Sequence, residues 1–391
     1  MLTGAFPASE MMQATMRVNA LYGDALKQYA SICRGKKFDR SGIISPKYFW
    51  DYIMNYIKIK LVVLLCIISI ININSLFADS SMPTDHAPIG VMGDHVHKTG
   101  EWMFSYRYGY MEMDGNRDNT NSVSTAEIHQ DFMMAPLNMT MEMHMFGTMY
   151  GVTDDMTLMA MIAYKDLEME MQTKPMAMGM MPANHRFKTH SKGFGDLKLS
   201  ALWTFMNTDN SSMHATVGMS IPTGSINKKD DNAMGLRVRM PYMMQLGSGT
   251  YDPLLGLTYT VKKQQWAFGL QTLNTFRLGK NDKGYQLGNE YTASTWAGYN
   301  VSHNMSLSLR LDGKAWENID GEDDDLNPMM SPTARADLRG GQRVDGLLGL
   351  NYEHGSGHRL AIEFGVPLHQ DLDGPQMETD YRLMLGWQYA P

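Results

Sequence analysis

Cysteine, long apolar runs and positive charge are all scarce in this chain, and each absence excludes a class of protein. The 391 residues include only Cys33 and Cys66, so the chain beyond residue 66 has no disulfide framework and no cysteine metal site. The longest apolar run, Leu61 to Ile71, has 11 residues, whereas a spanning helix needs about 20. The net charge of −7 argues against nucleic-acid binding. With 43% hydrophobic and 19% charged residues, the chain is neither disordered nor a coiled coil.

The region around the apolar run has the order of a secretory signal peptide. Lys58 and Lys60 precede the run, and the small residue Ala78 follows it. Signal peptides begin a chain, so we expect residues 54–78 to be the signal peptide, translation to start at Met54, and residues 1–53 to be an upstream extension. A cytoplasmic segment before a signal anchor is the alternative. Cys66 does not indicate a lipoprotein, because Leu65 is too large for the usual cleavage site.

Beyond residue 100, apolar and polar residues alternate with the period of a β-strand. Every second residue from Trp102 to Tyr110 is aromatic, and similar rows run from Leu197 to Phe205 and from Tyr381 to Tyr389. Short turns alternate with long polar segments at 113–138, 167–195, 223–251 and 316–342. This rhythm predicts an all-β fold over 100–391, a transmembrane antiparallel up-and-down β-barrel with about 12 strands and long outer loops. A further strand within 236–246 is an open alternative. The predicted strands are 102–112, 139–150, 156–166, 196–206, 213–222, 252–261, 266–277, 286–300, 305–315, 343–352, 358–367 and 380–389.

Three short phrases carry a family resemblance: Gly195 to Ser200, Met219 to Ser225, and Gln245 to Asp252. They resemble the transporter-like outer-membrane proteins grouped as meta-pathway phenol-degradation proteins. The likeness covers roughly residues 100–391 and implies an outer-membrane barrel that passes small, often aromatic or hydrophobic, compounds. The stretch Met82 to His97 resembles a methionine-rich subset of that family.

Alternation also predicts which charged side chains point into the barrel. The expected lumen-lining residues are Arg107, Lys198, Arg310, Asp312, Arg343, Asp345, Glu363 and Arg382. Charges of both signs can line an aqueous path and set ion preference. The alternative is structural pairing, such as Glu363 with Arg382, because twelve strands enclose a small bore.

Methionine and histidine suggest a second function. Sixteen of the 38 methionines fall between Met133 and Met181. Thioethers suit Cu(I), and imidazoles suit copper and zinc, so copper is the candidate metal. The candidate ligands are His86, His95 and His97 in the periplasmic segment 79–99, with Met176, Met178, Met180, Met181, His185 and His190 in a loop. Methionine is also an apolar filler, and where Met139, Met141, Met143 and Met145 alternate with Glu142 and His144 we expect the methionines to face lipid.

An enzyme is not expected. Barrel phospholipases place His and Ser two apart on one strand face, but the single His-x-Ser, His354 to Ser356, falls in a predicted turn. The acidic run Gly321 to Asp325 could bind Ca²⁺ or bridge to lipopolysaccharide, although such runs are usually solvated loop tips. The row from Tyr381 to Tyr389 looks like the signal that barrel-assembly machinery reads, with Ala390 and Pro391 trailing it.

These observations predict a protein of the Gram-negative outer membrane. Its expected function is a channel or transporter-like barrel for a small solute. The alternatives are a Met/His-rich, copper-binding outer-membrane protein and a structural barrel that displays loops. The expected partners are outer-membrane lipid, lipopolysaccharide, the barrel-assembly machinery and the solute, with no nucleic acid.

Overall fold

The computed structural model describes residues 82–175 and 182–391. The expected extension 1–53 and signal peptide 54–78 lie outside the described residues, and so do Met176, Met178, Met180 and Met181. Among the described residues, no helix is long and apolar enough to cross a membrane.

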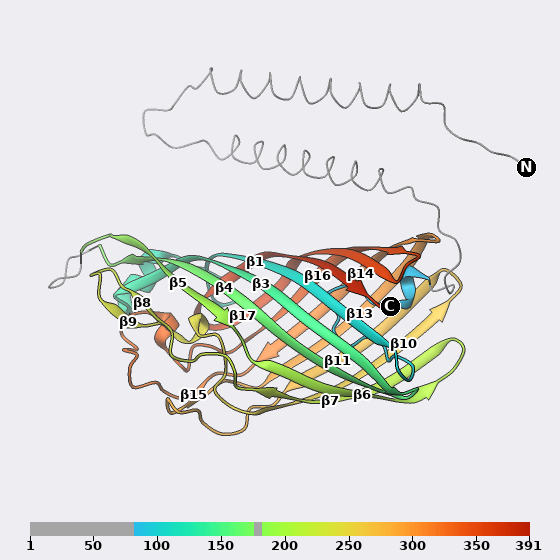
Figure 1. The fold of residues 1–391 in the computed structure, drawn as a ribbon. Helices are drawn as coiled ribbons and strands as arrows, with labels where there is room; N and C mark the ends of the chain where they lie inside the picture. Colours follow the sequence, from blue (N-terminus) through green and yellow to red (C-terminus); the bar gives the residue numbers. More distant parts are fainter. Residues whose placement is uncertain (1–81, 176–181) are drawn as a thin grey trace, which may run out of the picture. The chain divides into compact units, whose positions relative to one another are not determined.

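Eleven strands form one closed antiparallel sheet, as the period-two pattern predicted (Figure 1). Each of these strands pairs with the next one in the wall, and the last pairs with the first, so the eleven strands close on themselves. The strands are β1 (Trp102–Asn119), β3 (Met134–Thr153), β4 (Met156–Thr173), β6 (Leu197–Asn207), β7 (Ser211–Ile221), β10 (Asp252–Lys263), β11 (Trp266–Thr275), β13 (Glu290–Ser302), β14 (Met305–Trp316), β16 (Gly341–His354) and β17 (His358–Tyr389). Beside β4, β5 (Arg186–Phe194) extends the wall beyond β6.

The last strand is folded back on itself. Its residues up to Leu372 pair with β16, and its residues from Leu372 onward pair with β1. Gly374 has a φ of 77°, which suits a tight turn at this point. The two ends of β17 meet again, since the Ala390 amide donates to the Gly357 carbonyl at 3.0 Å. The chain therefore makes twelve passes along the wall, which agrees with the predicted count of about 12 strands.

The two ends of the barrel differ. One end carries the tight turns together with η1 (Pro83–Asp85) and the C-terminus, and the other carries the long connections (Figure 1). We call these the short-turn end and the long-loop end; in outer-membrane barrels the short turns face the periplasm. The long connections contain β2 (Asn121–Val123), α3 (Thr125–Asp131), β8 (Lys229–Asp231), β9 (Arg237–Arg239), η2 (Tyr242–Met244), β12 (Tyr285–Gln286), β15 (Asp320–Gly321) and η3 (Pro332–Ala334).

Two of the predicted loops are partly wall. Strand β1 continues to Asn119 and β4 to Thr173, so the expected loops 113–138 and 167–195 begin with strand, and β5 occupies much of the second. The possible strand within 236–246 does not join the wall, because β9 pairs only with β8 and η2 follows it. The barrel is therefore taller than predicted at the long-loop end.

Burial is inverted relative to a water-soluble protein. Outward rows such as Leu307, Leu309 and Leu311 are exposed, whereas inward residues such as Ser306, Ser308 and Arg310 are buried. Aromatic rings gather on the outer face at the short-turn end, where Trp102 lies 4.6 Å from Tyr150, Trp266 lies 4.7 Å from Tyr299, and His358 lies 4.4 Å from Tyr389 between ring centroids. An apolar outer band with an aromatic girdle on a closed sheet is the arrangement of a Gram-negative outer-membrane barrel.

The prediction that the β3 methionines face lipid is wrong. Met139 is fully buried and Met145 is 7% exposed, while their outward neighbour Phe146 is exposed. Toward the long-loop end, segment 240–246 packs against the inner side of the wall, which therefore needs apolar partners there. We call the result the methionine cluster; its buried members are Met113, Met139, Leu167, Met169, Met171, Met240, Met244, Leu246 and Met377.

Candidate functional site

The segment before the first strand lies inside the barrel at the short-turn end. Residues 82–99, which we call the plug, make hydrogen bonds to side chains on β1, β4, β7, β11, β13 and β17. Contacts with strands from all around the wall are available only to a segment within the lumen. Ala87, Ile89 and Val91 in the plug are at most 5% exposed, so the plug fills the bore at this level.

The wall holds the plug mainly through its backbone. Each bond joins one inward side chain to one plug amide or carbonyl. Four wall side chains contact plug carbonyls: Arg107 Nε donates to Ile89 (3.1 Å), the Gln271 side-chain amide donates to Met92 (3.0 Å), Arg359 donates to Ala87, and the His214 ring nitrogen lies 2.9 Å from Gly93. Three plug amides donate to wall side chains: Thr84 to Asn300 (3.1 Å), Gly90 to Glu363 (3.1 Å) and His97 to Thr157 (2.8 Å). Sequence reasoning missed most of these residues, whose only signal is a polar side chain at an inward position.

Apolar contacts complete the seat of the plug. Leu202 is fully buried and clusters with Met103 and Met149, with Val96 of the plug packed against them. Trp296 packs with Ala87 and Val91. Leu202 is an apolar residue at an inward position of β6, where its neighbours Ser200 and Thr204 are polar. This break in the alternation therefore marks a position that contacts the plug.

A chain of ion pairs runs along the inner face of the neighbouring strands β14, β16 and β17, beside the plug. Glu363 accepts from two guanidinium nitrogens of Arg310, each at 2.8 Å, and Arg310 also lies 3.1 Å from Asp312. The chain continues through Arg382, which contacts Asp312 at 2.6 Å and Asp345 at 3.1 Å. Arg343 ends it, 3.1 Å from Asp345.

The predicted lumen residues thus lie on inward positions, and six of the eight form this one network. Arg107 holds the plug, and Lys198 lies half-buried on the inward face of β6. The expected pairing of Glu363 with Arg382 is wrong: Glu363 binds Arg310, and Arg382 binds the two aspartates. The reason is register: on the intervening strand β16, Arg310 pairs with Leu347 and Glu363 with Gly349, two positions along on the same face, so the long Arg310 side chain reaches the Glu363 carboxylate.

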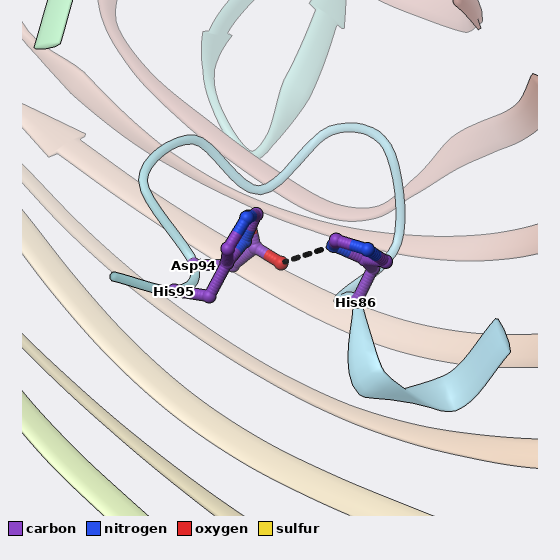
Figure 2. A group of neighbouring side chains, drawn as sticks. All are labelled: His86, Asp94 and His95. Carbon is purple, nitrogen blue, oxygen red and sulfur yellow. Dashed lines mark ion pairs between the residues drawn. The ribbon is translucent and has the colours of Figure 1, made fainter. Parts of the chain in front are cut away.

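Three of the predicted metal-site histidines meet within the plug. His86 lies on its first arm and Asp94 with His95 on its returning arm (Figure 2). One ligand atom from each of these three residues lies within 4.8 Å of the other two. The His95 Nδ1 is 3.0 Å from Asp94 Oδ1, and the His95 ring lies 4.6 Å from that of His86 and 4.7 Å from that of His97.

Burial sets the charge of this group. Burial, with the neighbouring His95 and Arg359, lowers the pKa of His86 well below its ordinary value, and burial with His95 lowers the pKa of His97 to about 4. For Asp94, burial alone would raise the pKa, but His95, His86 and Arg359 outweigh it and hold the pKa well below the usual range. At neutral pH Asp94 is therefore a carboxylate, and His86 and His97 are neutral imidazoles.

The other predicted metal ligands do not join this group. His185 and His190 are exposed near β5, where His190 pairs with Asp166 and the His185 ring stacks on Phe187. The Met176 to Met181 part of that loop lies outside the described residues. The structure therefore separates His185 and His190 from the histidines of the plug.

The three phrases that carry the family resemblance converge on one carboxylate. Asp196, at the break between β5 and β6, accepts from the Gly224 amide at 2.9 Å. It also accepts from the Ser248 amide at 2.8 Å and the Ser248 hydroxyl at 3.0 Å. One aspartate thus ties both ends of the connection between β7 and β10 to the wall, which gives these phrases a structural role.

Two smaller predictions can be placed. In the acidic run, Asp323 is 2% exposed and pairs with Arg239, and Asp325 lies 2.9 Å from Lys283, so these two carboxylates are partnered rather than free for Ca²⁺. His354 ends β16, and Ser356 lies in the turn before β17, so the His-x-Ser pair does fall in a short turn as predicted.

Comparison with known proteins gives a family and a fold. A family described as "Putative MetA-pathway of phenol degradation" matches residues 137–342, which is more than half of the chain. No curated protein matches the sequence. A crystal structure of an outer membrane channel from Pseudomonas putida F1 is similar over 76% of this chain and 98% of its own, with 19% identity and a TM-score of 0.52. The TodX monoaromatic hydrocarbon channel is matched over 75% of this chain and 90% of its own, with 8% identity and a TM-score of 0.40. Only the first structural likeness is strong enough to support the fold.

Proposed function

Because the chain belongs to the family described as putative MetA-pathway of phenol degradation, we propose that it is an outer-membrane channel for a small solute, closed by the plug. The observation that carries this proposal is the separate segment seated in the lumen. The plug is continuous with β1 only at residue 99, and elsewhere non-covalent contacts hold it. A purely structural barrel gives no reason for a separate segment inside its lumen.

The path itself has two halves. At the short-turn end it is lined by the ion-pair chain from Glu363 to Arg343 and by the plug. Toward the long-loop end it meets the methionine cluster, whose side chains are apolar, polarisable and flexible. Flexible thioethers accommodate varied apolar shapes, and the family description concerns phenol degradation, so we propose a small, uncharged aromatic or apolar solute.

The membrane setting supplies the other proposed partners. The exposed apolar rows contact lipid, and lipopolysaccharide is the expected outer-leaflet lipid. The row from Tyr381 to Tyr389 forms the returning limb of β17, and we propose that barrel-assembly machinery reads it during insertion. No catalytic role is proposed, since Ser356 lies outside a strand and is not held opposite His354.

Planar-bilayer conductance tests the channel directly. The full mature chain is compared with a variant lacking residues 82–97 and with Asp209→Ala, an exposed short-turn change that serves as control. We expect low or intermittent conductance for the full chain and the control, and a larger, steady conductance without the plug. Liposome swelling with phenol and with a charged solute of similar size tests the solute class. A plug-free barrel that stays sealed would contradict the proposal.

A further inference from the structure

We propose that the plug contains a binding site for one divalent transition-metal ion, formed by His86, Asp94 and His95, with His97 beside it. Two imidazoles and a carboxylate are the donor set that proteins use for Zn²⁺ and Cu²⁺. The proposal goes beyond channel function and does not depend on it, because metal binding is measured without any solute.

The geometry is close to that of a bound ion. The three ligand atoms lie within 4.8 Å of one another. Metal–nitrogen and metal–oxygen bonds of about 2.0–2.2 Å place tetrahedral ligands roughly 3.4 Å apart. Rotation of the side chains closes this difference, since His86 and His95 are at the surface of the plug rather than locked in a packed core.

Unpartnered nitrogen atoms point to a missing ligand. Nε2 of His95 and Nε2 of His97 are buried and have no hydrogen-bond partner, and the same holds for Nδ1 of His86. The His97 side chain is only 8% exposed, so water does not compensate for the lost bond. A buried polar atom without a partner is destabilising, and several together are rare unless a ligand binds them.

Asp94 supplies a negatively charged ligand for a cation, and the Arg359 guanidinium, which donates to the Ala87 carbonyl, is the positive charge beside it. Asp94 is held in place by the Ala87 amide, which donates to its Oδ2 at 2.8 Å, while its Oδ1 faces His95. This resembles the arrangement in which a carboxylate orients a metal-binding imidazole. The His86 and His95 side chains are 25% and 20% exposed, so an ion can reach them.

The site would join the two arms of the plug. His86 lies eight positions before Asp94 and nine before His95, and the backbone between them forms a loop (Figure 2). Within this loop, the Gly90 amide donates to Glu363. An ion bound to both arms would stabilise this loop as a rigid unit. Metal binding is therefore a way to fix the plug in the shape that the wall recognises.

Titration calorimetry of the tag-free, chelator-treated protein in detergent tests the site. Zn²⁺ and Cu²⁺ are the probes, Ca²⁺ is the hard-ion control, and His86→Ala and His95→Ala are the variants. His190→Ala is the matched control, because it removes an exposed histidine outside the group. We expect one equivalent of Zn²⁺ or Cu²⁺, no Ca²⁺ binding, at least tenfold weaker affinity in either variant, and no change in the control.

Two results would overturn the proposal. One is the absence of stoichiometric Zn²⁺ or Cu²⁺ binding by the wild-type protein. The other is binding that survives in the His86→Ala/His95→Ala double variant but is lost when Met176 to Met181 are deleted. Heat-modifiable migration on gels confirms that each variant is folded, and electron paramagnetic resonance of bound Cu²⁺ should report two nitrogen ligands that become one in His95→Ala.

Discussion

Replacing Glu363 with glutamine should strongly destabilise the barrel, because this buried carboxylate serves three donors. Its Oε1 accepts from Arg310 Nε, and its Oε2 accepts from both Arg310 Nη2 and the Gly90 amide. A glutamine has the same shape but only one oxygen, so at least one donor would face an NH₂ group. Glu363 is 2% exposed, so water cannot fill the gap.

The size of the effect follows from the buried pair. Breaking a buried ion pair by removing one charge costs about 3–5 kcal/mol. Asp312 remains 3.1 Å from Arg310, so the lower value applies, about 3 kcal/mol or roughly a 150-fold change in the unfolding equilibrium.

Urea unfolding in detergent, followed by tryptophan fluorescence, measures this loss. Glu322→Gln is the control, since Glu322 is exposed in a loop and should change stability by less than about 0.5 kcal/mol. A Glu363→Gln variant as stable as the control would refute the role assigned to this carboxylate.

Three further predictions follow from the plug, the loop junction and the methionine cluster. A Cβ on Gly90 would lie 2.2 Å from Arg310 Nη2, so Gly90→Leu should displace the plug and raise single-channel conductance toward that of the plug-free variant. Asp196→Ala removes three hydrogen bonds and should lower the free energy of unfolding by about 3 kcal/mol, whereas Asp209→Ala should leave urea unfolding unchanged. Under mild peroxide, mass spectrometry should find Met139 oxidised at least tenfold more slowly than Met329, which is 60% exposed; equal rates would contradict the inward orientation.

The sequence predicts the membrane-level wall well because one physical rule governs it. Between Trp102 and Tyr110, and again between Leu307 and Leu311, lipid on one side and polar lumen on the other impose strict alternation. Charged residues on the inward positions, such as Arg310 and Glu363, followed from the same rule. Their exact partners did not, because pairing depends on the register between strands.

Toward the long-loop end the lumen is filled by an apolar segment, so apolar side chains can also point inward, which explains the wrong prediction for the β3 methionines. Met139 was expected to face lipid with the alternating methionines that follow it, yet it lies inside, because segment 240–246 packs on the inner face there. An alternating pattern gives the period of a strand but not which face is covered. The plug has no period at all, and its placement depends on wall side chains that are far apart in sequence, such as Arg107 and Gln271.

A reversible cross-link between plug and wall tests the central claim most directly. A Cβ on Gly386 lies 2.3 Å from Cγ1 of Ile89, and the chain after Cys66 has no other cysteine, so Ile89→Cys/Gly386→Cys should form one specific disulfide. We predict that the oxidised double variant shows no single-channel conductance and that a reductant restores the intermittent conductance of the full chain within the same bilayer. Equal conductance in the oxidised and reduced states would show that solute does not pass where the plug lies.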